Sequence, residues 1–356
     1  MTSPVVIGLD QGGTAINATV LDETGRFLVS ELVETPSRVR EGPDVAMRAL
    51  VEAFDDVLRR VGVERADVRA VGLDTPGPAS AEGRISSLGS TNFAHDGWRG
   101  FDIRGALEQH LALPVTYAND GNAAALYAHQ VHFGPDAPER SSLSAVVGTG
   151  LGGGLVQDGR LISGAAGMAG EIGHVHVPLA GVLEPDQPVP TCACGFAGDA
   201  ESVASLTGIR QNLLPYWLGR HPDHPLAGVE PREAAKQVRG YAESGDELAL
   251  AVFAQQAAVI GSLFTIVANL TDPHAFFLGG GVVEAAPHFR DWFLAQVQAG
   301  TSLREEQRAV VEFALVPDRD MAGARGAALA ALAAGGAADA GDAHGDRPAV
   351  VVREPS

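Results

Sequence analysis

Two glycine-rich turns follow apolar segments of this chain, and each could bind a phosphate group. The first is Asp10-Gln11-Gly12-Gly13-Thr14, which comes after the apolar stretch 5–9. The second is Gly148-Thr149-Gly150-Leu151-Gly152-Gly153-Gly154, which follows the apolar stretch 144–147. Because glycine has no Cβ and tolerates positive φ, a backbone rich in it can turn several amides toward one anion. We interpret each turn as a phosphate loop between two strands.

Other interpretations of the second turn are weaker. Gly148, Gly150 and Gly153 satisfy the dinucleotide-binding fingerprint, but that fingerprint should open a helix. The residues that follow are instead typical of a short strand that ends in the turn Asp158-Gly159. Glycines that serve only a tight bend are the other alternative. Neither turn has the Gly-Lys-Ser/Thr ending of a P-loop, so the sequence excludes that class of nucleotide site.

Two aspartates stand where strands are expected to end. Asp10 lies beside the first glycine turn, a position that suits a carboxylate associated with Mg²⁺, which prefers oxygen ligands. A solvated turn aspartate is the alternative. Asp120 follows the predicted strand 114–117 and lies between Asn119 and Asn122. A carboxylate there could accept the proton of a hydroxyl nucleophile, or it could only cap the helix that begins near Asn122.

The two cysteines are separated by a single residue, and a histidine precedes them. A pair so close does not make a conventional disulfide framework, so Cys192 and Cys194 with His174 upstream favour a metal site. Two buried structural thiols are the alternative. His95 and His176 are interpreted as ordinary surface or core histidines.

The elements that must position these residues alternate between helices and strands, which indicates an α/β architecture. Helical spacing of apolar residues predicts helices over 45–58, 106–111, 247–269 and 321–334. Strands are predicted over 68–73, 114–117 and 275–278, besides those that flank the glycine turns. Beyond Gly335 the composition shifts to Ala, Gly, Asp, Pro and Arg, which predicts a flexible tail over 335–356.

Composition is that of an ordinary soluble protein. With 356 residues, of which 46% are hydrophobic, the chain is long enough for two domains with their own cores. No window has eighteen uninterrupted apolar residues, and Met1-Thr2-Ser3-Pro4 lacks the basic region of a signal peptide. We therefore expect a cytoplasmic protein without a membrane partner. The formal net charge of −19 disfavours nucleic acid as a partner.

Taken in order, the motifs resemble those of the ROK sugar kinases, a family of the actin-like ATPase superfamily. The resemblance runs from about Val5 to about Ala333. It includes both glycine turns, the segment around Asp120, the Gly-Glu-Ile-Gly-His motif at 170–174, and the Cys-Ala-Cys-Gly motif at 192–195 with Glu201. Asp-Pro-His-Ala at 272–275, followed by the glycines at 279–281, completes the series.

The resemblance implies a two-domain α/β fold of the actin-like (ribonuclease H-like) type, with the substrates in a cleft between the domains. Residues 1–120 would form the small N-terminal domain, onto which the last helix, about 321–334, packs back. Residues 121–320 would form the larger domain. The resemblance also implies a homodimer.

The resemblance further implies a glucokinase-like enzyme. It would transfer phosphate from ATP, with Mg²⁺, to the 6-hydroxyl of glucose or of a related or amino-substituted hexose, and Asp120 would be the general base. The implied nucleotide residues are Asp10, Gly12, Gly13, Thr14, Gly148, Thr149, Gly150, Gly279, Gly280 and Gly281. The implied sugar residues are Asn92, Asn119, Asp120, Glu171, His174 and Glu201, whose side chains can bind several ring hydroxyls.

This chain departs from the family's pattern in the metal motif and near Asn92. Asp199 stands where the family has the third cysteine of a zinc site. A tetrad of His174, Cys192, Cys194 and Asp199 is still chemically able to bind Zn²⁺. Asn92 is followed by two additional residues before the family's Gly-Trp, so substrate choice is expected to differ.

Two other classes of protein stay open, as does another phosphoryl donor. A ROK-type transcriptional regulator would carry a helix-turn-helix domain before the first phosphate motif, and Asp10 lies too close to Met1 to leave room for one. A sugar-binding protein that has lost catalysis would have no physical need for both glycine turns and Asp120. Ala15 replaces a lysine that many members of the family have, and polyphosphate is an alternative to ATP.

Overall fold

The computed structural model describes residues 4–31, 33–77, 79–87, 93–317 and 319–339. The chain divides into two compact units. As far as these ranges are described, the first unit comprises Met1–Arg140, Gly154–Gly170 and Pro317–Ser356, and the second comprises Ser141–Gly153 and Glu171–Val316. Each unit contains its own sheet and helices.

The first unit contains a five-stranded sheet in the order β3-β2-β1-β4-β5. β1 (Val5–Gln11) and β2 (Ala15–Asp22) form an antiparallel hairpin around the first glycine turn, and β3 (Val33–Pro36) extends it. β4 (Val68–Thr75) and β5 (Val115–Asn119) run parallel to β1. Three parallel strands therefore end at the same edge.

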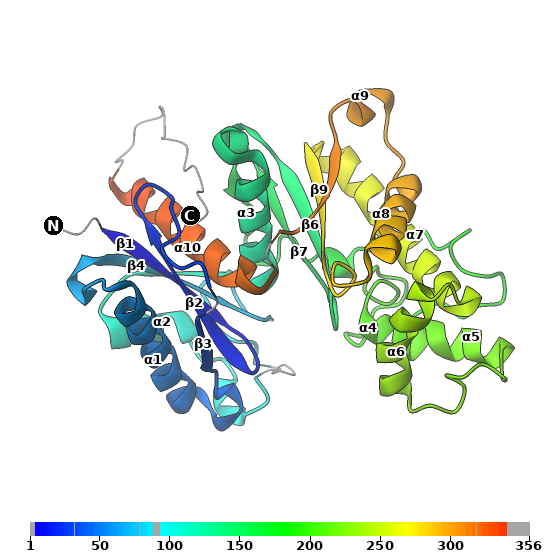
Figure 1. Ribbon diagram of the computed structural model, residues 1–356, viewed down its shortest axis with the longest axis horizontal. Helices are drawn as coiled ribbons and strands as arrows, with labels where there is room; N and C mark the ends of the chain where they lie inside the picture. The colour runs from blue at the N-terminus through cyan, green and yellow to red at the C-terminus, as the bar shows by residue number, and fades with distance from the viewer. Residues whose placement is uncertain (1–3, 32, 78, 88–92, 318, 340–356) are drawn as a thin grey trace. The chain divides into compact units, whose positions relative to one another are not determined.

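Helices cover both faces of this sheet (Figure 1). α1 (Pro43–Val61) and α2 (Ile103–Leu111) pack on one face, and α10 (Arg319–Asp339) lies on the other beside α3 (Asp120–Phe133). α1 begins at a proline, whose missing N–H has no partner to lose in the first turn. It ends at Gly62, whose φ of 69° gives the left-handed cap that glycine adopts without strain.

α10 approaches the sheet closely because the two strands beneath it have glycine at the contact. Gly8 of β1 and Gly72 of β4 are cross-strand neighbours. A Cβ at Gly8 would overlap the carbonyl oxygen of Ala324, and a Cβ at Gly72 would overlap that of Ala327. Only glycine therefore lets the helix backbone rest on these two strands.

The second unit is built on the sheet with strand order β10-β9-β6-β7-β8. β6 (Ser142–Val147), β9 (Ala275–Gly280) and β10 (Glu312–Leu315) are parallel. β7 (Leu151–Gln157) follows the second glycine turn, and within it the chain passes into the first unit. It pairs with β8 (Arg160–Leu161) across Asp158-Gly159, whose positive φ angles of 47° and 69° suit a tight hairpin.

Helix α7 (Glu247–Thr271) packs against α5 (Leu214–Arg220), α6 (Pro231–Glu243) and α8 (Pro287–Gly300). The shorter α4 (Leu206–Gly208) and α9 (Glu305–Arg308) complete the helices of this unit in the described ranges. Among the described helices, α7 alone is long and apolar enough to cross a membrane, yet 61% of its most apolar window is buried in the structure. That degree of burial fits a core helix.

The structure differs from the expected division of the chain at residue 120. α3 and the residues up to Arg140 belong to the first unit, because α3 packs along α10. α10 also continues past Gly335, to Asp339. The rest of the predicted tail, residues 340–356, lies outside the described residues.

Candidate active site

Three aspartates gather at the carboxyl edge of the first sheet. Asp10 and Asp74 are cross-strand partners near the ends of β1 and β4. Asn119, the last residue of β5, is the partner of Thr75, and Asp120 follows it. We call Asp10, Asp74 and Asp120 the acidic edge. Ligands of α/β sheets bind outside the carboxyl ends of parallel strands, which is where these residues lie.

Asp74 was not predicted as a site residue. Its side chain is 0% exposed, and no N–H or O–H of another described residue donates to either of its carboxylate oxygens. Burial raises its pKa well above the usual value, and the negative charges of Asp10 and Asp120 raise it further. The signal that could have revealed it is the one that revealed Asp10, an acid at the end of an apolar strand.

Asp10 faces the same burial but has better partners. Burial raises its pKa, whereas hydrogen bonds from Asp74 and Asn17 lower it, and Asn17 Nδ2 donates to Asp10 Oδ2 at 3.2 Å. Two carboxyl groups this close cannot both be charged at little cost. We infer that they share one proton, which Asp74 carries and donates to the Asp10 carboxylate.

Asp74→Asn is expected to raise the melting temperature by about 2–4 °C at pH 7.5, because asparagine donates to Asp10 without an ionisable group to desolvate. Asp74→Leu fills similar space but leaves Asp10 with Asn17 as its only donor of the two, so it should lower the melting temperature by a similar amount. Differential scanning fluorimetry of both variants beside the wild type measures this. Equal destabilisation by both substitutions would contradict the shared proton.

Asn119 and Asp120 have different roles at the start of α3. Asn119 is the N-cap, and its Oδ1 accepts the N–H of Asn122 at 2.7 Å. Asp120 Oδ1 accepts the N–H of Gly121 at 2.7 Å. The positive end of the helix dipole stabilises a carboxylate at this position. The capping function considered for Asp120 is thus performed by its neighbour.

The first glycine turn is tight. Gly12 N donates to Ala15 O at 2.9 Å, and a Cβ at Gly12 would lie 2.8 Å from that same oxygen. Thr14 is exposed, and its carbonyl oxygen accepts the N–H of Ser37. Gly13 and Thr14 therefore form the open tip of a hairpin whose base Gly12 fixes.

In the second unit, the turn between β6 and β7 is held by Glu201. The Oε2 atom of Glu201 accepts the N–H of Leu151 at 2.8 Å, and a Cβ at Gly150 would overlap that oxygen. Gly148 N donates to Gly150 O at 2.9 Å, while Gly148 O accepts the N–H of Leu206. These bonds fix the turn without a ligand.

The other expected sugar residues divide between the units. Glu171 precedes the short 3-10 turn Ile172–His174, of which His174 is the last residue, and Glu201 N donates to Gly173 O at 2.8 Å. Glu171, His174 and Glu201 are thus part of the second unit, whereas Asn119 and Asp120 are part of the first. Asn92 lies outside the described residues.

The four expected metal ligands converge in the second unit. One donor atom from each of His174, Cys192, Cys194 and Asp199 lies within 4.8 Å of all the others. Nδ1 of His174 is 3.1 Å from Asp199 Oδ2, and the two sulfur atoms are 3.0 Å apart. Burial raises the pKa of the Cys192 thiol, the backbone N–H of Cys194 lowers it, and the side chains of Cys194 and Glu201 raise it. An imidazole, two sulfurs and a carboxylate are a donor set that suits zinc.

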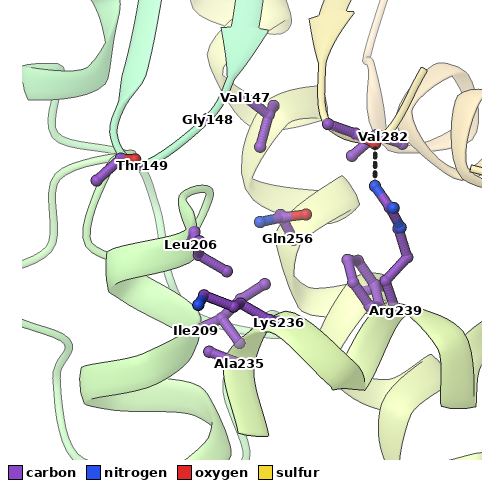
Figure 2. Close-up of a pocket in the computed structure, with 12 residues that line it drawn as sticks. Val147, Gly148, Thr149, Leu206, Ile209, Ala235, Lys236, Arg239, Gln256 and Val282 are labelled. Atoms are coloured by element: carbon purple, nitrogen blue, oxygen red, sulfur yellow. Dashed lines mark hydrogen bonds between the residues drawn. The ribbon is translucent and has the colours of Figure 1, made fainter. Parts of the chain in front are cut away.

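A cavity of about 340 Å³ lies beside the second glycine turn (Figure 2). The strands β6 and β9 are adjacent and parallel, so the turns that follow them lie side by side. Gly148 after β6 and Gly281 after β9 therefore bracket the cavity, which means that both line it from these two turns. The lining residues are Val147, Gly148, Thr149, Leu206, Ile209, Ala235, Lys236, Arg239, Phe253, Gln256, Gly281 and Val282. The volume falls in the range of small-molecule sites.

The predicted nucleotide glycines contribute unequally to this cavity. Gly148, Thr149 and Gly281 line it. Gly280 has a φ of 87°, and a Cβ there would overlap Val147 O, so this glycine allows the strand to turn at its end. A Cβ at Gly279 would lie 2.8 Å from the side chain of Val316, so Gly279 is a packing position.

Sequence reasoning missed the polar residues of the cavity. Lys236 is the only lysine in the sequence, a signal that could have directed attention to it. Arg239 Nη1 donates to Gly281 O at 2.6 Å, which ties α6 to the glycine turn after β9. Gln256 belongs to a Gln-Gln pair in the middle of α7, a helix that is largely apolar.

Known proteins are similar to this chain over most of its length. The family model described as "ROK family" matches residues 6–334. The glucokinase of Halalkalibacterium halodurans is 31% identical over 84% of this chain and 89% of its own length. The N-acetylmannosamine kinase of Citrobacter koseri is 30% identical over 91% of this chain and 97% of its own length.

Two solved structures are similar over nearly their whole length. The ROK hexokinase of Thermus thermophilus has a TM-score of 0.70 and 30% identity, covering 93% of this chain and 98% of that one. A ROK family glucokinase of Streptomyces griseus, solved with glucose and AMPPNP, has a TM-score of 0.65 and 28% identity, covering 92% and 99%. The expected actin-like ATPase fold is confirmed. A match over nearly the whole chain, with the motifs in the expected order, leaves one conclusion: this chain belongs to the ROK family.

Proposed function

We propose that this protein is an ATP-dependent hexose kinase that phosphorylates the 6-hydroxyl of glucose or a related hexose. The chain is a sugar kinase of the ROK family, and the choice of donor and hexose is the proposal. The observation that carries it is the cavity bracketed by Gly148 and Gly281 at the ends of two parallel strands. An apolar cavity beside glycine turns can hold a nucleoside while backbone amides face its phosphates.

In the proposed mechanism, Asp120 accepts the proton of the 6-hydroxyl as that oxygen attacks the γ-phosphorus of ATP. The γ-phosphate is transferred to the sugar, and ADP leaves. The helix dipole of α3 favours a carboxylate at this position, where the proposed base is needed. Glu171, His174 and Glu201 bind and orient the ring hydroxyls.

The acidic edge fits a Mg²⁺ ion, which the reaction is expected to need. Asp10 keeps an ionised carboxylate, since Asp74 holds the shared proton, and Mg²⁺ prefers such oxygen ligands. Bound there with ATP, the ion would neutralise phosphate charge. The glycine turns bind the phosphate oxygens through their backbones.

ADP release with Mg-ATP over a panel of sugars tests the proposed function. The panel contains glucose, mannose, allose, glucosamine, N-acetylmannosamine and 3-amino-3-deoxyglucose. We expect ADP release to rise well above background with at least one of them. If no sugar raises it, the ATP-dependent hexose kinase is abandoned, and polyphosphate as donor and sugar binding without catalysis are tested instead.

We also propose that the His174, Cys192, Cys194 and Asp199 cluster binds one zinc ion with a structural role. Its function would be to hold the His174 ring in place for the sugar, since a kinase site excludes water and needs no activated hydroxide. Asp199 is 0% exposed, and its Oδ1 accepts the N–H of Ser202 at 3.0 Å. That bond fixes the carboxylate in the way that second-shell contacts orient metal ligands.

Zinc content and thermal stability test this proposal. The purified protein should contain about one zinc ion per chain, and a chelator should lower its melting temperature by several degrees. Asp199→Ala should weaken zinc binding by about tenfold or more, whereas Asp199→Cys should retain it. His176→Ala, which alters a histidine outside the tetrad, is the matched control and should bind zinc like the wild type. Wild-type protein that neither contains nor takes up zinc would contradict the proposal.

The expected homodimer and cytoplasmic location stay predictions. Light scattering of the purified protein measures the first, and cell fractionation measures the second.

A further inference from the structure

The cavity of the second unit contains a buried polar side chain that the fold leaves unsatisfied. Gln256 is 1% exposed, and neither its Oε1 nor its Nε2 has a hydrogen-bond partner within the described ranges. Figure 2 shows its amide among the side chains that line the cavity. A buried amide without partners costs free energy, so a ligand that offers a donor and an acceptor there gains affinity.

The neighbouring glutamine shows what a structural amide looks like in this helix. Gln255 Nε2 donates to Gln187 Oε1 at 2.6 Å and to Val182 O at 3.2 Å. Its Oε1 accepts the indole N–H of Trp217 at 3.1 Å. Both residues lie on α7 and both are buried, but only Gln256 faces the cavity. Its lack of partners is therefore specific to the site.

The remaining wall favours a flat apolar ring. Apolar residues line the cavity together with Gln256, among them Val147, Leu206, Ile209, Phe253 and Val282. The two cations at the wall already have partners, since Arg239 donates to Gly281 O and Lys236 Nζ donates to Glu233 Oε1 at 2.8 Å. A ligand with one donor beside one acceptor suits this wall better than one with many polar atoms.

We propose that Gln256 recognises the adenine base of the phosphoryl donor. The inference rests on the proposed function, because it assumes that the donor is ATP. Adenine presents its 6-amino donor next to a ring-nitrogen acceptor, which the donor and acceptor of a carboxamide match. Guanine has a carbonyl oxygen at position 6 and an N–H at position 1, which reverses that donor and acceptor pattern, and its 2-amino group would be buried without a partner against the apolar wall. Gln256 thus determines nucleotide specificity in the cavity that Gly148 and Gly281 bracket.

A pair of nucleotides that differ only at the 6-position tests the proposal. Purine riboside triphosphate lacks the 6-amino group of ATP but keeps its ring and phosphates. Wild-type protein should bind ATP about 10- to 100-fold more tightly than this analogue, the discrimination expected of one bidentate amide pair. Gln256→Leu and Gln256→Met should bring the ratio close to one. Titration calorimetry without sugar measures binding, and the coupled assay with sugar measures kcat/KM for both donors.

Two controls separate this effect from misfolding. The Gln256 variants should melt at or above the wild-type temperature, because an unsatisfied buried amide is replaced by an apolar group. Gln298→Leu, an exposed glutamine on α8, should keep the wild-type ratio. Lys236 reports occupancy independently of activity, because it is the only lysine of the chain and lies at the cavity. ATP should protect it from acetylation, as read by peptide mass spectrometry.

The outcomes distinguish this inference from the proposed function. Turnover of ATP and the analogue with equal kcat/KM, or a wild-type ratio in Gln256→Leu, overturns the role of Gln256 and leaves the kinase standing. ATP turnover without protection of Lys236 overturns it as well, because the nucleotide then binds elsewhere. If no nucleotide binds or reacts, both proposals fall.

Discussion

Replacing Asp120 with asparagine is expected to lower kcat by about 10²- to 10⁴-fold, the contribution typical of a general base. Asparagine keeps the shape of the side chain and the bond from Gly121 N, but it cannot accept the hydroxyl proton. Sugar binding uses other groups as well, so the dissociation constant for the sugar should change only a few-fold. Coupled ADP release gives kcat, and titration calorimetry without nucleotide gives sugar affinity.

A matched variant shows whether the loss of a negative charge at the start of any helix in this unit lowers kcat. Asp44 lies in the first turn of α1 in the same unit and is not part of the acidic edge. Asp44→Asn should therefore leave kcat within about twofold, while it loses a comparable interaction with a helix dipole. A kcat for Asp120→Asn within tenfold of the wild type would show that another group takes the proton. Loss of sugar affinity at unchanged kcat would make Asp120 a binding residue instead.

Two of the three aspartates of the acidic edge were predicted from the residues next to them in the sequence, and the third was not. Asp10 and Asp120 were found because each follows a predicted strand beside glycine or asparagine. Asp74 also follows an apolar strand, but its position at a strand end does not show which other acidic side chain lies beside it in the sheet. Only the parallel register of β1 with β4 places Asp74 against Asp10, and register is set by tertiary packing.

The cavity was harder to predict for a similar reason. The glycines of its rim were visible in the sequence because turns have local signatures. Lys236 and Gln256 lie on helices instead, and helical periodicity separates buried from exposed faces without showing which buried face borders a cavity. The sequence also did not show that α3 belongs to the first unit. α3 packs closely on α10, and the two helices are nearly two hundred residues apart in the chain.

That packing gives the second prediction of large effect. Gly326 on α10 lies against α3, where a Cβ would overlap Ala123 O and lie 2.9 Å from Ala123 Cα. The overlapping atoms belong to a helix backbone, which cannot move aside as a flexible side chain can. Gly326→Ala should therefore force α10 and α3 apart. We expect a loss of about 3 kcal/mol or more in the free energy of unfolding, measured by urea denaturation.

The same substitution nine residues further along α10 is the control. Gly335 is exposed, and a Cβ there would have nothing within 4 Å. Gly335→Ala should leave stability unchanged or raise it by up to about 1 kcal/mol, because alanine loses less backbone entropy than glycine in a helix. Both variants change the helix propensity of α10 alike, so the difference between them isolates the contact with α3. If Gly326→Ala proves as stable as Gly335→Ala, then α10 does not lie on α3 as closely as described, and its hold on β1 and β4 through Gly8 and Gly72 comes into question with it.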